Sequence, residues 1–333
     1  MPKTLVTGAA GFIGFHLCKR LLEDGHEVVG LDAVTDYYDT ALKRARLAQL
    51  EGAGFTFVEE RVETRGVLID LFDAHRFDYV YHLAAQAGVR HSIEKPRDYL
   101  DSNIIGTFEL LEAARAYPPK HMLIASTSSA YGSNTEMPYR ETMKTDHQMS
   151  FYAATKKATE NMAHSYAHLY DLPVTMFRFF TVYGPWGRPD MALFKFTKAI
   201  LGGAPIDVYN HGDMMRDFTY VEDLVAALLR LAPAAPQRGA PTGPEDSLSP
   251  VAPWRVVNIG NGSPVKLGAF IEAIEAATGL PAKRNLMPMQ PGDVPATWAD
   301  TALLAQLAGE SQYTPVTEGV RRFVDWYRAY YAA

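Results

Sequence analysis

In the first 180 residues, short runs rich in β-branched and aromatic residues alternate with longer stretches in which apolar positions recur every three or four residues. The longer stretches predict helices over 13–25, 99–117 and 150–171. Because strand and helix alternate regularly, the pattern predicts an α/β fold, a doubly wound parallel sheet of the Rossmann type with helices on both faces. The short runs predict the strands of that sheet, over 3–7, 27–32, 55–59, 78–84, 121–126 and 174–179.

The pattern changes after about residue 180, where proline and glycine become frequent and helical stretches alternate with irregular segments. This change predicts a Rossmann domain over 1–180 and a smaller C-terminal lobe over 181–333. Segments at about 212–230 and 254–260 are expected to rejoin the Rossmann domain, since "WRVVNIG" has the pattern of another strand. Residues 231–253, rich in Pro, Ala and Gly, predict a surface loop.

Composition narrows the class of protein. The chain has 333 residues, 47% of them hydrophobic, which is enough for a full core. A formal charge of −6 gives no basic stripe, so nucleic acid is not an expected partner. The single cysteine, Cys18, allows neither an internal disulfide nor a Cys-based metal site, and we expect no metal. We find no run of about 18 apolar residues and no signal-peptide pattern, so we expect no membrane partner and a cytoplasmic location.

Directly after the first predicted strand comes "GAAGFIG", in which glycines 8, 11 and 14 enclose Phe12 and Ile13. Gly8 permits a tight strand-to-helix turn, Gly11 lets the backbone approach a pyrophosphate, and Gly14 lets the helix pack closely on the sheet. The N-terminus of that helix offers free N–H groups to phosphates. The motif therefore predicts a dinucleotide-binding turn.

Asp32 stands at the end of the second predicted strand, 18 residues beyond Gly14. A carboxylate at this place accepts hydrogen bonds from both hydroxyls of an adenosine ribose and repels a 2′-phosphate. The residues that follow, "AVTDYYD", are acidic and contain no arginine for such a phosphate. The sequence therefore predicts NAD rather than NADP as the cofactor.

The segment "FYAATKK" places Tyr152 and Lys156 four residues apart, on one face of a predicted helix. A phenol has a pKa near 10, so it is a poor base at neutral pH. A neighbouring ammonium, together with the positive nicotinamide, favours the phenolate. Lys156 can also bind the nicotinamide ribose. The spacing thus predicts a catalytic acid–base pair beside the cofactor.

These motifs resemble those of the extended short-chain dehydrogenase/reductases, and among them the nucleotide-sugar 4-epimerases. The resemblance covers nearly the whole chain. Its most specific part looks like bacterial UDP-glucuronate 4-epimerases and is carried by "AAQAGVR", "RFFTVYGPWGRPDMALFKFTKAI", "RDFTYVEDL" and "QPGDV".

The resemblance implies a mechanism and a UDP-sugar substrate. Tyr152 would take the proton of the sugar 4-hydroxyl while hydride passes to NAD, with the hydroxyl of Thr127 beside the reacting oxygen. The 4-keto sugar would turn over in the pocket and take the hydride back on its other face. The resemblance also implies further cofactor contacts at Leu83, Ala84, Ala85, Gln86 and Asn103.

In the C-terminal lobe the resemblance implies UDP contacts from Arg188, Arg216 and Asp293, with Arg90 near the site. Two positions depart from the family pattern. Gln290 replaces a phosphate-binding arginine, and Arg61 stands where the family usually has an acid that reaches the adenine amine. Arg61 has no acceptor for that amine, so adenine recognition is expected to shift to a neighbour such as Glu60.

The stretch "STSSAYG" follows the fifth predicted strand and decides between related reactions. Sugar 4,6-dehydratases carry an Asp-Glu pair where this chain has Ser128 and Ser129, and hydroxyls cannot replace that acid–base pair. Short hydroxyls suit a C6 carboxylate instead, so Thr127, Ser128, Ser129 and Thr181 are expected to bind a uronic acid.

Epimerisation of UDP-glucuronate to UDP-galacturonate is therefore the leading interpretation. Decarboxylation of UDP-glucuronate and epimerisation of a neutral UDP-hexose stay open, and a non-catalytic NAD sensor is disfavoured by the intact Tyr152 and Lys156. The resemblance further implies a homodimer, formed through the helices that carry Asn103 and Tyr152.

Overall fold

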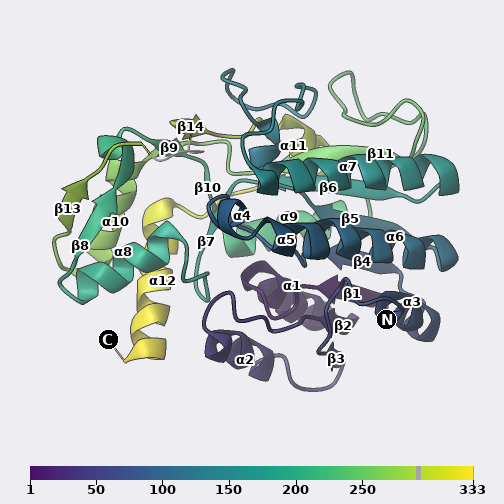
Figure 1. Cartoon of the computed structure of the whole chain (residues 1–333), viewed down its shortest axis with the longest axis horizontal. Helices are drawn as coiled ribbons and strands as arrows, with labels where there is room; N and C mark the ends of the chain where they lie inside the picture. The colour runs from purple at the N-terminus through teal and green to yellow at the C-terminus, as the bar shows by residue number, and fades with distance from the viewer. Residues whose placement is uncertain (290–293, 333) are drawn as a thin grey trace.

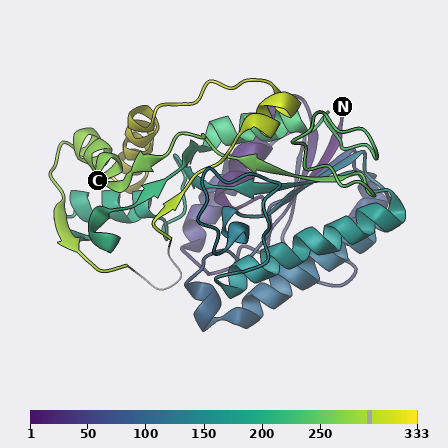
Figure 2. The ribbon, with the colours of Figure 1, turned by 90° about the horizontal axis from the view of Figure 1, so that it is seen from above.

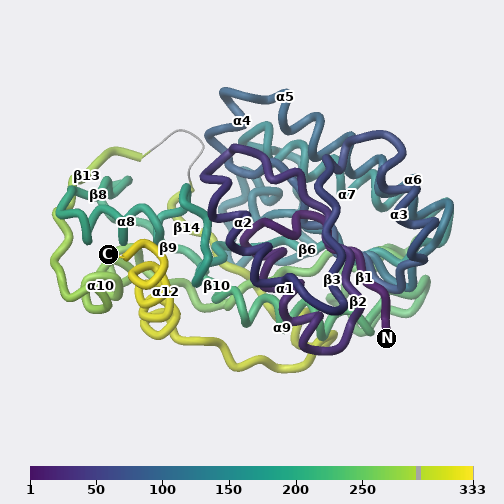
Figure 3. The backbone as a smooth tube through the Cα atoms, turned by 90° about the horizontal axis from the view of Figure 1, so that it is seen from below, coloured from purple at the N-terminus to yellow at the C-terminus, as the bar shows by residue number. Residues whose placement is uncertain are grey.

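The structure is a computed structural model that describes residues 1–289 and 294–332. A large lobe is built around a parallel sheet, and a smaller lobe stands beside it and holds the C-terminus (Figure 1). The N-terminus lies at the far end of the large lobe, as the view from below shows (Figure 3).

The described residues form a seven-stranded sheet with the order β11-β6-β5-β4-β1-β2-β3, in which every neighbouring pair is parallel. The predicted doubly wound α/β fold is therefore confirmed. β1 lies between β2 and β4, with Thr4 opposite Val28 on one side and Tyr79 on the other. The strands are β1 (Lys3–Thr7), β2 (Glu27–Leu31), β3 (Phe55–Val58), β4 (Tyr79–His82), β5 (His121–Ala125), β6 (Val174–Phe179) and β11 (Trp254–Ile259).

Helices cover both faces of this sheet, because the strand residues are apolar on both sides. One face packs against α1, α9 and α11, and the other against α3, α6 and α7. The view from above shows α6 and α7 side by side on the outside of the molecule (Figure 2). The helices of this lobe are α1 (Phe12–Glu23), α2 (Thr40–Ala48), α3 (Val67–His75), α4 (His91–Glu94), α5 (Pro96–Tyr99), α6 (Gly106–Ala116), α7 (Phe151–Tyr170), α9 (Val221–Leu231) and α11 (Ala302–Ala308).

One predicted helix is divided in the structure. The stretch 99–117 contains the end of α5, a π-helical turn η1 (Leu100–Ile105) and α6. A wider π turn places one extra residue in the helix, and such turns often occur at functional sites. Here the turn carries Asn103, whose buried amide binds the backbone beside the pocket described below.

The smaller lobe has its own core, in which α8 (Ala192–Leu201), α10 (Leu267–Thr278) and α12 (Val316–Tyr331) pack together around Phe194, Phe270 and Phe323. Its strands are short. They are β7 (Thr181–Tyr183), β8 (Pro205–Val208), β9 (Met215–Arg216), β10 (Phe218–Tyr220), β12 (Val265–Lys266), β13 (Lys283–Leu286) and β14 (Ala296–Thr297).

The chain crosses between the lobes more than once. After β10, α9 packs against α1 on the sheet, and β11 then adds to the sheet edge beside β6. Residues 232–253 between them contain neither helix nor strand. A buried ion pair between Arg255 and Asp246, 3.0 Å long, fixes this loop against β11.

Candidate functional site

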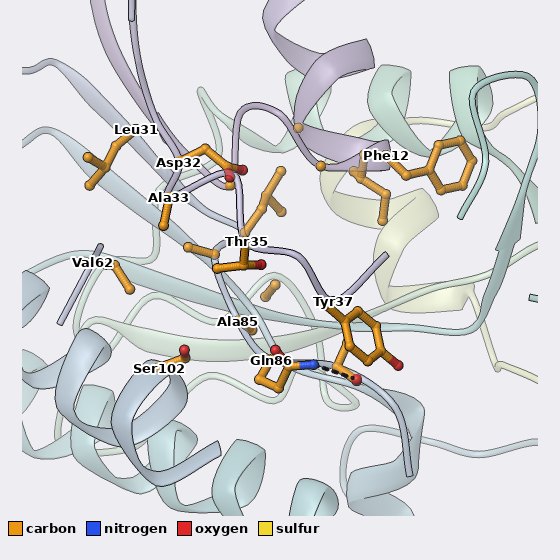
Figure 4. A pocket seen from close by; sticks show the side chains of 18 of the residues that line it. Phe12, Leu31, Asp32, Ala33, Thr35, Tyr37, Val62, Ala85, Gln86 and Ser102 are labelled. Carbon is orange, nitrogen blue, oxygen red and sulfur yellow. Dashed lines mark hydrogen bonds between the residues drawn. The ribbon is translucent and has the colours of Figure 1, made fainter. Parts of the chain in front are cut away.

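The main cavity opens at the carboxyl ends of β1, β2, β4 and β5, on both sides of β1, where the strand order reverses. Parallel α/β sheets bind their ligands at this kind of switch point. Figure 4 shows Asp32 on one side of the cavity, with Gln86 and Ser102 on the other. The predicted residues that line it are Gly8, Gly11, Phe12, Ile13, Gly14, Asp32, Leu83, Ala84, Ala85, Gln86, Tyr152, Lys156 and Arg188.

The backbone packs so closely at the glycine turn that side chains at two of its glycines would collide with it. Gly8 has φ +77°, and a Cβ placed there would lie 2.8 Å from the backbone nitrogen of Ala84. A Cβ on Gly14 would overlap the carbonyl oxygen of Gly8. The N-terminus of α1 follows directly and has no side-chain cap. This cradle fits a pyrophosphate, whose oxygens can accept from the free N–H groups.

The Asp32 carboxylate is oriented by the backbone. Its Oδ2 accepts a hydrogen bond from the amide of Ala10 at 3.1 Å, and its Oδ1 accepts one from the amide of Val34 at 2.8 Å. Each oxygen keeps further acceptor capacity toward the cavity. An adenosine ribose placed there could donate from both hydroxyls, as NAD would.

Two cations near Asp32 were not predicted from the sequence. Lys43 lines the cavity, and its ammonium donates to the carbonyl of Thr35 at 2.8 Å. The fully buried Arg46 donates to the carbonyls of Ala10 and Trp186 at 2.8 and 2.7 Å. The sequence does carry a signal for them. Lys43 and Arg46 lie beside Leu42 and Leu47 on the buried face of α2, where a solvated charge is not expected.

At the adenine end, the cavity is lined by residues 60–63 after β3. Arg61 turns toward Glu63, and its Nη1 lies 3.0 Å from the Glu63 carboxylate. Both Glu60 and Glu63 line the cavity. The structure thus offers two nearby acceptors for an adenine amine, one of which is already bound to Arg61.

Tyr152 and Lys156 lie in the first two turns of α7, which Ser150 caps by accepting from the amide of Ala153. Burial lowers the pKa of Lys156 to about 8, and the charge of Glu160 opposes this. Burial raises the pKa of Tyr152, whereas a hydrogen bond with Thr127 and the charge of Arg188 lower it. Arg188 is thus a second cation that favours the phenolate of Tyr152. The spacing of Tyr152 and Lys156 did not indicate it.

Asn103 acts on the site through the backbone. Its Oδ1 accepts from the amide of Gln86 at 2.8 Å, and its Nδ2 donates to the carbonyl of Gln86 at 3.1 Å and to Thr155 at 3.0 Å. The side chain therefore fixes the loop after β4 against α7, and it reaches the cavity through Gln86.

The row of hydroxyls from Ser126 to Ser129 directly follows β5 and continues into a short turn, η2 (Ser128–Tyr131). Ser126 donates to Glu160 at 2.6 Å, and the Thr127 oxygen accepts from the amide of Ser129 at 3.1 Å. Ser128 and Ser129 are half-buried. Protein groups thus engage the first two hydroxyls of the row, and Thr127 also contacts Tyr152.

Arg188 joins the main cavity to a second one in the small lobe, since it lines both. The second cavity is lined by apolar side chains from α8, β7, β10, α10 and α12, and Thr181 is a polar member. Arg188 forms a two-pronged ion pair with Asp190, with distances of 3.0 and 2.5 Å. Tyr37 donates to the same carboxylate at 3.3 Å. Asp190 thereby orients the guanidinium at the junction.

The remaining predicted contacts lie farther out. Arg216, in β9, donates to the carbonyls of Met215 and Pro295 at 2.9 and 3.1 Å. The Arg90 guanidinium lies 4.9 Å from the ring centre of Tyr209 in the small lobe. Neither arginine lines the two cavities just described. Asp293 and Gln290 lie outside the described residues.

Over residues 1–289 and 294–332, no group of three or more His, Cys, Asp or Glu side chains is arranged to hold a metal ion. In the same residues, no helix combines the length and apolar character needed to cross a bilayer.

Comparisons with known proteins agree with this geometry. Residues 4–242 match the model of the NAD-dependent epimerase/dehydratase family. A probable UDP-glucuronate 4-epimerase of Rhizobium meliloti (strain 1021) is 53% identical over 97% of this chain and 96% of its own length. UDP-glucuronate 4-epimerase 4 of Arabidopsis thaliana is 46% identical over 98% of this chain and 76% of its own length.

A solved structure shows the same likeness in three dimensions. The UDP-glucuronic acid 4-epimerase from Bacillus cereus, in complex with UDP-glucuronic acid and NAD, superimposes with a TM-score of 0.87. The alignment covers 99% of this chain and 100% of that one, at 31% sequence identity.

Proposed function

Since the chain belongs to the NAD-dependent epimerase/dehydratase family, we propose that it is an isomerase that interconverts UDP-glucuronate and UDP-galacturonate by inverting C4 of the sugar. One observation carries the choice of reaction. Ser128 and Ser129 follow Thr127 where a dehydratase needs an acid and a base, while Tyr152 and Lys156 line the cofactor cavity intact.

Bound NAD supplies the acceptor and donor of hydride for C4. Tyr152 takes the proton of the 4-hydroxyl during oxidation and returns it during reduction, since its phenol opens into the cavity. Thr127 holds the phenol by a hydrogen bond, and Arg188 favours its deprotonated form. Lys156 supplies a second positive charge on the same helix face. Because the hydride is returned, the reaction has no net redox change.

Oxidation at C4 makes the uronic acid a β-keto acid, which loses CO₂ when the carboxylate bond aligns with the carbonyl π system. We infer that Thr127, Ser128, Ser129 and Thr181 hold the carboxylate near the carbonyl plane by charge-assisted hydrogen bonds. Thr181 lines the cavity of the small lobe with Arg188, which supports its part in this assignment. Thr127, Ser128 and Ser129 line neither cavity and directly follow Ser126, which lines the main one. Arg188, at the junction of the two cavities, suits the diphosphate.

Turnover of UDP-glucuronate tests the function directly. The protein is incubated with UDP-glucuronate and the products are followed by ¹H NMR. We expect UDP-galacturonate to accumulate to equilibrium without added NADH and without CO₂. A UDP-pentose as the main product would make the protein a decarboxylase instead. Conversion of UDP-glucose in preference to UDP-glucuronate would make it a neutral-hexose epimerase.

We also infer a homodimer through the outer faces of α6 and α7. Four large apolar side chains on these helices are exposed, Phe108 by 43%, Phe151 by 42%, Leu169 by 63% and Tyr170 by 41%. The two helices lie side by side on the outside of the molecule (Figure 2), and Tyr166 of α7 donates to Glu112 of α6 at 2.7 Å. A rigid pair of helices with exposed apolar side chains suits an interface between two copies related by a two-fold axis.

Charge reversal on these helices tests the dimer. A double variant with Phe108→Glu and Leu169→Glu is expected to shift the protein from dimer to monomer, because four carboxylates would meet in the interface. The measurement is size-exclusion chromatography with light scattering. Leu280→Glu is a matched control, since Leu280 is 42% exposed in the other lobe and should leave the mass unchanged. A wild-type mass of one chain would contradict the dimer.

The proposed location is a reducing cytoplasm. The chain has a single cysteine, Cys18, which is fully buried between α1 and the sheet. A fold without disulfides suits a reducing compartment, and a sugar nucleotide with NAD is the substrate and cofactor pair that this compartment offers.

A further inference from the structure

A buried carboxylate lies beneath the proposed catalytic pair. Glu160 is four residues beyond Lys156 and eight beyond Tyr152 on α7, so the three side chains follow one face of the helix. Glu160 has no exposed surface. An ionised carboxylate in such a place is costly unless it is paired and hydrogen-bonded, so its partners define what it does.

The main partner is Arg178 of β6. Arg178 Nε lies 2.9 Å from Glu160 Oε1, and Nη2 lies 2.8 Å from Oε2. Arg178 is also buried, and its guanidinium stacks 4.6 Å from the ring centre of Tyr131 in the turn η2. This two-pronged bond fixes the carboxylate in the plane of the guanidinium.

A second partner belongs to the site itself. The hydroxyl of Ser126 donates to Glu160 Oε1 at 2.6 Å. Ser126 lines the cofactor cavity and directly precedes Thr127, which contacts Tyr152. One carboxylate therefore joins the helix that carries Tyr152, the strand end that carries Thr127, and the strand that leads to Thr181.

The carboxylate also supplies charge. Burial opposes ionisation, but Arg178, Lys157 and Ser126 together outweigh it and hold the pKa of Glu160 at about 2. Lys157 lies 3.1 Å from Oε2 at the outer side of the pair. Glu160 is thus negative throughout the range in which the enzyme works, one helical turn from the buried ammonium of Lys156.

We infer that Glu160 is a positioning residue of the reaction. Its carboxylate, fixed by Arg178, holds the Ser126–Thr127 strand end against the catalytic helix and provides the negative charge that keeps Lys156 an ammonium. The inference rests on the proposed function only in taking Tyr152 and Lys156 as the reacting pair.

The surroundings of Lys156 make this charge decisive. Burial favours the neutral amine, and the opposing influence is Glu160. The titratable groups nearby are Tyr152 on the same helix face and His82 of β4. Burial lowers the pKa of His82 to about 3, so this ring stays neutral and adds no charge near neutral pH.

The test compares Glu160→Gln with Arg178→Met. Both variants break the same ion pair, but only the first removes the negative charge. Glu160→Gln should lower the pKa of Lys156, so that the alkaline limb of kcat/KM for UDP-glucuronate moves to lower pH by about one unit. In Arg178→Met, Glu160 still has the ammonium of Lys157 and the hydroxyl of Ser126 as partners, so it should stay ionised and the alkaline limb should stay in place or move to higher pH. Equal shifts in both variants, or a shift in neither, would overturn the inference.

Glu160→Gln leaves Arg178 buried without a counter-charge and could therefore destabilise the fold. A second variant separates this effect from the effect on Lys156. The double variant Glu160→Gln with Arg178→Met removes both charges and should keep the alkaline shift. The pKa of Lys156 is also read without turnover, from the ¹³Cε shift of lysine-labelled protein assigned with Lys156→Met. A wild-type protein that leaves UDP-glucuronate unchanged refutes the proposed function, whereas an unshifted ¹³Cε titration in Glu160→Gln and in the double variant refutes the positioning role.

Discussion

Replacing Tyr152 by phenylalanine is expected to lower kcat for epimerisation roughly 10²- to 10⁴-fold, the usual contribution of a positioned proton-transfer group. The substitution removes one oxygen atom and leaves the ring packed against Tyr99, whose ring centre is 6.0 Å away. Binding of NAD and UDP-glucuronate should change little. The measurements are initial rates by ¹H NMR and substrate dissociation constants by calorimetry.

Tyr37→Phe is the matched control for this variant. Tyr37 lines the same cavity, but its hydroxyl donates to Asp190 and is not assigned a part in proton transfer. This bond is long, 3.3 Å, and acts on Arg188 only through Asp190, so its loss should cost roughly tenfold at most, the upper value for an ordinary hydrogen bond. Should Tyr152→Phe lose no more activity than Tyr37→Phe, another group must transfer the proton.

Replacing Thr181 by valine is expected to open a leak to CO₂. Valine keeps the shape of threonine but has no hydroxyl, so one hydrogen bond to the carboxylate of the 4-keto sugar is lost. A hydrogen bond to a charged group contributes about 1.5–3 kcal/mol, which corresponds to a rise of roughly 10- to 100-fold in the ratio of decarboxylation to epimerisation. The ratio is measured as released ¹⁴CO₂ from uronate labelled at C6 against UDP-galacturonate formed.

Thr181→Ser is the control, since serine keeps the hydroxyl and should hold the ratio near the wild-type value. Arg188→Leu should leak as well and should also slow the reaction, because Arg188 favours the Tyr152 phenolate. If Thr181→Val and Arg188→Leu both release no more CO₂ per epimer than wild type, the carboxylate is held by other groups.

The parts of the site that were predictable from the sequence are those whose chemistry is local. The glycines at 8, 11 and 14 lie within one turn, and Tyr152 and Lys156 lie within one helix. Asp32 is recognisable because it ends a strand. The structure brings these separate signals to one cavity, as the predicted parallel sheet requires.

The parts that escaped prediction depend on contacts between distant segments. Glu160 and Arg178 are 18 residues apart and on different elements, and each alone resembles an ordinary surface charge. Lys43 reaches the cavity only because α2 folds back on the loop after β2. The π turn at 100–105 could not be predicted locally, because its wider winding accompanies the bonds of Asn103 to Gln86 and Thr155, which are distant in the sequence.

The position of β11 at the edge of the sheet has a consequence for how the chain is made. β6 ends at Phe179, and its neighbour begins 75 residues later at Trp254. At about 5–20 residues per second, a ribosome needs roughly 4–15 s to supply that neighbour. From its emergence until β11 follows, the apolar edge of β6 is open to pairing with other nascent chains, so this edge needs protection during that interval.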